Sequence, residues 1–178
     1  LASSALIGGL SNVATITCAA TEINAQPYLG IGVDLSNHGF GHMGGNKRDA
    51  RGIPYYEKTR GWLFGLIAGM AKRLDSIPEG DGTMLDNTVI VYLSDAAEAH
   101  HSRCGQWPFV LIPGKNTSLK GGQYIDFPHY MQDGHREIGN LYTTLLHAAG
   151  DKREYFGVHD AMLKGEAHGA GPLEPLFA

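Results

Sequence analysis

The stretch Val89–Gly114, VIVYLSDAAEAHHSRCGQWPFVLIPG, is the part of the sequence that decides the fold. It begins and ends with short apolar runs, Val89–Leu93 and Phe109–Ile112, which are long enough for buried strands and too short for helices. A polar segment separates the two runs. In parallel α/β sheets, the functional residues lie in the loop beyond the carboxyl end of such a strand. We therefore expect a functional loop between these two strands.

The polar segment contains Asp95, Glu98, His100 and His101. A carboxylate and a neutral imidazole in one loop are the ligands that a divalent metal requires, so we predict Asp95 and His101 as metal ligands. His100 points the other way in an extended backbone and could contact a substrate. The alternative for Asp95 is a turn residue that accepts hydrogen bonds from nearby backbone N–H groups. Glu98 is either a general base or a solvated surface residue.

A second group of histidines lies in Ser36–Gly45, SNHGFGHMGG. Its four glycines disfavour a helix, so we expect a loop in which His38 and His42 converge. These two histidines join Asp95 and His101 in the predicted metal site. Zinc is the default metal for mixed histidine and carboxylate ligands, and manganese and iron are alternatives. The alternative for both histidines is a polar surface loop.

The rest of the chain alternates between helical and strand patterns. Apolar residues at spacings of three and four predict helices over Tyr55–Ile77 and Arg136–Ala149, and Gly8 and Gly9 end a short helix in Leu1–Leu10. We also expect a buried strand over Asn12–Cys18 and a hairpin-like edge strand over Lys120–Ile125. This order predicts an α/β fold. We expect residues 1–160 to form a partial α/β domain and residues 161–178 an extended tail.

The composition restricts the classes of partner. The 178 residues are 43% hydrophobic and 18% charged, with a net charge of -4 and no basic run, which argues against a nucleic-acid surface or an anionic membrane patch. No apolar stretch is long enough to span a bilayer. Cys18 and Cys104 allow one disulfide or two thiols. Three strands are few for a doubly wound sheet, so we expect a missing N-terminal half or another chain to complete the fold.

Several segments carry a resemblance to a known family. They are YYEKTRGWLFGLIAGMAKRLDSIPEGDGTMLDNTVIVYLSD, which is Tyr55–Asp95, together with His101–Gly114, Leu119–Gly122 and the helix around Asn140–Tyr142. They resemble the C-terminal half of a family of exported bacterial proteins of unknown function, named for a His-x-x-Ser-His-His motif. A sister family belongs to the alkaline phosphatase and sulfatase superfamily.

The resemblance implies the C-terminal part of an alkaline-phosphatase-like α/β sheet with flanking helices, in a periplasmic or extracellular protein. It also implies metal ligands at the strand ends, where Asp95 follows one strand and His101 precedes the next. The motif departs from the family pattern, because Gly41 stands in place of the serine and Met43 in place of the last histidine. Ala96 also follows Asp95, where a phosphatase or sulfatase often has histidine.

Three functions follow as hypotheses. The first is a metal-dependent hydrolase of phosphate or sulfate esters, in which the metal activates water or an alkoxide. The second is a non-catalytic structural or assembly protein of the cell envelope or of an extracellular complex, which keeps the fold and works within a larger assembly. A third, a metal-free cytosolic α/β domain, leaves the clustered histidines unexplained. Fold alone does not distinguish the first function from the second.

Overall fold

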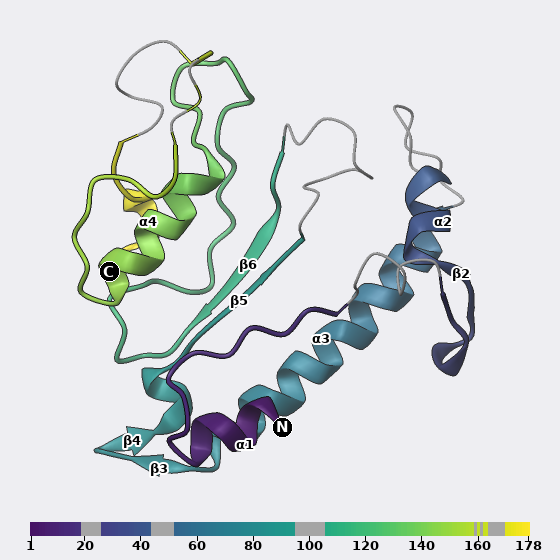
Figure 1. The fold of residues 1–178 in the computed structure, drawn as a ribbon, viewed down its shortest axis with the longest axis horizontal. Helices are drawn as coiled ribbons and strands as arrows, with labels where there is room; N and C mark the ends of the chain where they lie inside the picture. The colour runs from purple at the N-terminus through teal and green to yellow at the C-terminus, as the bar shows by residue number, and fades with distance from the viewer. Residues whose placement is uncertain (19–25, 44–51, 95–105, 159, 161, 164–169) are drawn as a thin grey trace. The chain divides into compact units, whose positions relative to one another are not determined.

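The structure is a computed structural model that describes residues 1–18, 26–43, 52–94, 106–158, 160, 162–163 and 170–178 (Figure 1). These residues form a mixed α/β chain. The helices are α1 (Ala2–Ile7), α2 (Asn37–Met43), α3 (Ile53–Asp75) and α4 (Ile138–Ala148). The strands are β1 (Pro27–Tyr28), β2 (Val33–Ser36), β3 (Pro78–Glu79), β4 (Gly82–Thr83), β5 (Val89–Leu93) and β6 (Phe109–Pro113). Short 3-10 helices span Leu29–Ile31, Met84–Asn87 and Glu174–Leu176.

The described strands pair only with their neighbours in sequence. Each of the three sheets has two antiparallel strands, in the orders β1-β2, β3-β4 and β5-β6. The chain divides into two compact units, Leu1–Leu85 and the described residues from Asp86 to Ala178. Within the described ranges, no helix is long and apolar enough to cross a membrane.

The long helix α3 dominates the first unit and confirms the predicted helix over residues 55–77. Pro54 lies in its first turn, where the missing N–H costs nothing, and Lys72 and Arg73 lie in its last turn, where cations interact favourably with the helix dipole. Its buried residues are Thr59, Leu63 and Leu74. The predicted apolar face is only partly buried, because Leu66 is 55% exposed.

An aromatic cluster fixes α2 on α3. Phe40 of α2 is fully buried; it stacks on Tyr55, with ring centroids 6.1 Å apart, and meets Tyr56 edge-on at 4.8 Å. Tyr28 of β1 lies 6.5 Å from the same ring and 6.2 Å from Trp62 of α3. Burial of these rings stabilises a helix that is too short to persist alone.

The predicted strand over Asn12–Cys18 is wrong. The structure assigns no strand there, and Val13 and Ile16 are 77% and 57% exposed. A β-rich sequence becomes a strand only where a neighbouring strand pairs with it and buries one face. The predicted edge strand over Lys120–Ile125 is also wrong, since the only pairing described near it is the isolated bridge between Leu119 and Phe177.

In the second unit, β5 and β6 confirm the two strands predicted within Val89–Gly114. Five residue pairs join them, from Val89 with Pro113 to Leu93 with Phe109. The pairing is antiparallel, so the premise of a parallel sheet with its loop at a strand's carboxyl end is wrong here. A parallel connection needs a crossover of a dozen or more residues that is usually helical, and the polar link between these strands has no helical periodicity.

The core of the second unit is a leucine cluster made by α4 and the chain segments beside it (Figure 1). Its buried members are Leu119, Leu141, Leu173 and Leu176. Leu173 and Leu176 lie in residues 170–178, which the sequence predicts to be part of an extended tail. The backbone N–H of Ala178 also donates to the carbonyl of Ser118 at 2.9 Å.

Helix α4 confirms the prediction over residues 136–149, but its most buried side chains include polar ones. Asn140, Thr143 and Thr144 are fully buried, whereas the predicted apolar face is fully buried only at Leu141. The Thr143 hydroxyl donates to the carbonyl of Gly139 at 2.9 Å, and the Thr144 hydroxyl donates to that of Asn140 at 2.7 Å. These internal hydrogen bonds offset the cost of burying polar groups.

Candidate functional site

The predicted ligands Asp95 and His101 lie outside the described residues, which include only the two flanks of their segment. Trp107 joins these flanks, because its indole Nε1–H donates to the Ser94 carbonyl at 2.6 Å. Leu93 and Phe109, the last residue of β5 and the first of β6, form the neighbouring residue pair of the sheet. The ends of the segment that carries both predicted ligands are therefore held side by side.

The structure places His38 and His42 on helix α2, so the predicted glycine-rich loop is wrong. Each glycine in a helix costs about 1 kcal/mol relative to alanine, but burial of an aromatic ring contributes roughly 2–3 kcal/mol, and Phe40 is fully buried. Ser36 caps the helix, since its Oγ accepts a hydrogen bond from the Gly39 N–H at 2.9 Å. Tertiary packing thus overrides the glycine content.

The helix gives the two histidines a defined spacing. Residues four apart in an α-helix lie on the same face, one turn above the other. His38 is solvent-exposed, and position 42 follows it by one turn of α2. Two histidines at this spacing form half of a helical metal site. Across the described ranges, no three His, Cys, Asp or Glu residues come together as a metal-binding group, so this pair accounts for two ligands only.

A second polar group lies at the start of α4 and was not singled out from the sequence. It is named here the carboxylate–phenol cluster and comprises Tyr130, His135, Glu137, Tyr155 and Asp160. The Tyr155 hydroxyl donates to one Glu137 carboxylate oxygen at 3.0 Å, and the Asp160 N–H donates to the other at 3.2 Å. The Tyr130 hydroxyl donates to Asp160 at 2.6 Å. The sequence feature that indicates part of this cluster is Glu137, three residues before Asn140, which is a helix-capping pattern.

The charges of Tyr130, Tyr155 and Asp160 are fixed at neutral pH. Burial and the hydrogen bond to Glu137 raise the pKa of Tyr155 to about 12. The hydrogen bond to Asp160 raises the pKa of Tyr130, and the same bond lowers the pKa of Asp160. Both phenols therefore keep their protons while Asp160 is anionic. Such phenols are donors that hold the chain in place rather than nucleophiles.

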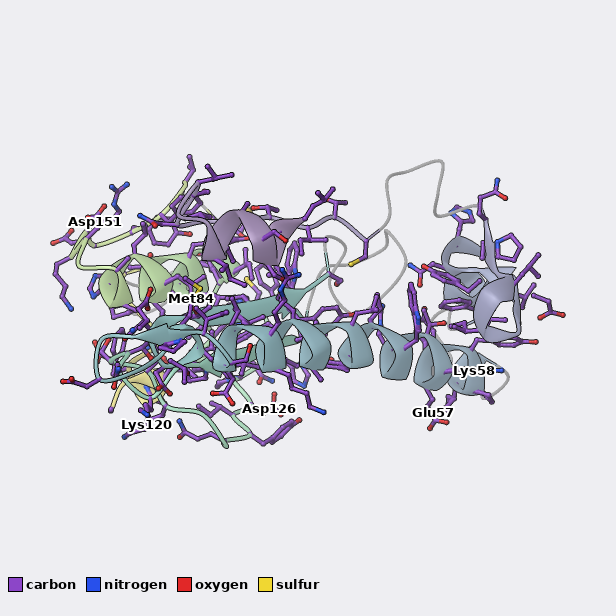
Figure 2. All side chains as sticks on the ribbon, turned by 90° about the horizontal axis from the view of Figure 1, so that it is seen from below. Glu57, Lys58, Met84, Lys120, Asp126 and Asp151 are labelled. Carbon is purple, nitrogen blue, oxygen red and sulfur yellow. The ribbon has the colours of Figure 1, made fainter. Side chains whose placement is uncertain are left out.

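An apolar pocket lies in the first unit. Its volume is about 360 Å³, and it is lined by Trp62 and the continuous segment from Gln26 to Ile31. Glu57 and Lys58 project from the early turns of α3 (Figure 2), where the Lys58 ammonium donates to the Gly32 carbonyl at 3.2 Å. The lining of the pocket in the described part of the chain is mainly apolar, with Gln26 and Tyr28 as the polar side chains.

In comparisons with known proteins, no family model, no curated protein and no solved structure matches the chain. The residues of the chain itself are therefore the basis for the function proposed below.

Proposed function

We propose that this protein binds a divalent metal ion, with zinc as the default, through His38 and His42. The observation that carries the proposal is their four-residue spacing on one helix, α2. Neutral imidazoles at this spacing bind first-row metals, and water or further side chains complete the coordination. Asp95 and His101 are the further ligands that the sequence predicts.

The finer part of the proposal is hydrolysis of phosphate or sulfate esters by an exported protein with an alkaline-phosphatase-like domain. Its support is the motif resemblance described above. A bound metal lowers the pKa of a coordinated water and neutralises the developing oxyanion. Completion of the domain by an N-terminal half or another chain belongs to the same proposal.

The test is elemental analysis by mass spectrometry after zinc loading and desalting. We expect about one metal per chain in the native protein and a large loss in His38→Ala and His42→Ala. His129→Ala is the matched control, because His129 is also exposed and is hydrogen-bonded to Gln106 instead. Asp95→Asn and His101→Ala test the two further ligands. A native protein without metal, or full retention in His38→Ala, contradicts the proposal.

The second candidate is a non-catalytic assembly role, and exposed apolar side chains favour it. Trp62 and Leu66 lie one turn apart on α3 and are 41% and 55% exposed, and Leu29 beside the pocket is also exposed. Exposed apolar patches mark interaction surfaces. Sedimentation analysis of the native protein and of Leu66→Glu tests this role. Concentration-dependent association that the substitution abolishes supports it, and a native protein that stays monomeric argues against it.

A further inference from the structure

The C-terminal segment is attached to α4 in two different ways. In the first attachment, the core end, the described hydrogen bonds join groups that do not titrate. Leu173 and Leu176 are buried, the Leu173 N–H donates to the Thr144 hydroxyl at 2.7 Å, and the Asn140 side chain donates to the Gly171 carbonyl at 2.8 Å. We therefore expect these hydrogen bonds to persist at acid pH.

The second attachment, the polar end, depends on two carboxylates. Glu137 accepts from the Tyr155 hydroxyl and from the Asp160 N–H. Asp160 in turn accepts from the Tyr130 hydroxyl at 2.6 Å and from the Met162 N–H at 2.8 Å. In each of these four hydrogen bonds the acceptor is a carboxylate oxygen, and hydrogen bonds to an ionised acceptor are the stronger kind.

The polar end lies directly on the backbone of α4. A Cβ atom added to Gly139 would lie 2.6 Å from the Tyr155 hydroxyl oxygen and 2.9 Å from the Phe156 carbonyl oxygen. Glycine is therefore required for the segment to approach so closely.

We propose that the polar end is an acid-released latch: protonation of Glu137 and Asp160 releases Tyr155 and Asp160 from Glu137 at the start of α4, and Met162 from Asp160, while the core end remains docked. Among the described residues, Tyr130, His135 and Tyr155 face the two carboxylates. Arg136 donates to the His135 carbonyl.

The direction of the pH effect follows from these groups. Asp160 has a lowered pKa in the folded protein, chiefly because Tyr130 donates to it. Its stabilisation is therefore complete above the ordinary value of 3.8 and is lost as the pH falls through the lower folded pKa. The charge of His135 also lowers the pKa of Asp160.

The experiment is an NMR measurement of amide exchange on the whole chain from pH 7 to well below 3.8, the ordinary pKa of Asp160, corrected for intrinsic exchange. We expect the protection of the Asp160 and Met162 amides to fall roughly tenfold or more at the acid end, because charge-assisted hydrogen bonds are lost. The Leu173 amide, in the core end, should keep its protection. Loss of protection at all three amides together, or unchanged protection at Asp160 and Met162, overturns the proposal.

Variants separate the latch from general acid sensitivity. Combined Glu137→Gln and Asp160→Asn substitution keeps acceptor oxygens but removes both titrations, so the acid-dependent fall should disappear. Asp151→Asn is the control, because Asp151 pairs with Arg153 outside the latch. If the double variant does not fold, the wild-type comparison of Met162 with Leu173 still decides the question.

Discussion

The Trp107 indole donates to the Ser94 carbonyl at 2.6 Å, across the two ends of the segment that joins β5 to β6. This hydrogen bond joins the described ends of the two strands, between which the sequence-predicted ligands Asp95 and His101 lie in the chain.

Replacement of Trp107 by phenylalanine should therefore loosen this end of the sheet. The ring is kept and one hydrogen bond is lost, so we expect a loss of about 1 kcal/mol in the free energy of unfolding. Urea denaturation measures it. Trp62→Phe is the matched control, since Trp62 lies on the exposed side of α3, and it should change stability less. Equal effects of the two substitutions would show that the hydrogen bond is unimportant.

Gly139→Ala should destabilise the protein, although alanine favours helices. The new methyl group would lie 2.6 Å from the Tyr155 hydroxyl oxygen, so Tyr155 must move and lose its bond to Glu137. We expect a cost of about 1–3 kcal/mol. Gly69→Ala in α3 is the opposite case, because nothing lies within 4 Å of its added Cβ, and it should gain up to about 1 kcal/mol. Thermal unfolding of both variants gives the comparison, and a stabilised Gly139→Ala variant would rule out the close contact.

Thr144→Val should remove the acceptor for the buried Leu173 N–H while the volume stays similar. An unsatisfied buried donor costs roughly 1–3 kcal/mol, measured as a shift in the urea midpoint. Thr144→Ser keeps the hydroxyl and should lose less. If both substitutions cost the same, the methyl group and not the hydrogen bond holds the segment.

Tyr155 should ionise only at strongly alkaline pH. Its pKa is raised to about 12 by burial and by Glu137, so it stabilises the folded state fully below the ordinary value of 10.0, and this contribution is lost as the pH rises through 12. Ultraviolet absorbance should show its phenolate only near that pH, and Tyr155→Phe should remove this late component. A titration curve that Tyr155→Phe leaves unchanged near pH 12 would contradict the assignment.

Several elements could be predicted because local pattern alone defines them. The helix α3 and the strands β5 and β6 have clear periodicity and turn residues at their ends. The predicted direction of strand pairing was wrong: an apolar run is compatible with either direction, and the signal for an antiparallel pair was the lack of helical periodicity in the link between the strands. Helix α2 was missed because its stability comes from Phe40, which packs on Tyr55 and Tyr56. The strand predicted over residues 12–18 was wrong for the opposite reason. This segment has high β propensity, but it pairs with no described strand.

The candidate site followed the same division. His38 and His42 could be identified from the sequence as candidate ligands. Their position on one helix, four residues apart, could not be predicted. The carboxylate–phenol cluster joins Tyr130, Glu137 and Asp160, which are separated in the chain and come together only through tertiary structure.

The position of the leucine cluster in the chain has a consequence for synthesis. In the first unit, the described buried hydrophobic residues Val33, Phe40, Leu63 and Leu74 have all been made by residue 74. In the second unit, Leu173 and Leu176 supply two of the four buried leucines. Domains fold in order as the nascent chain emerges. The first unit can therefore form its core on the ribosome, while the second must wait for Leu176 and keeps Leu119 and Leu141 uncovered until then.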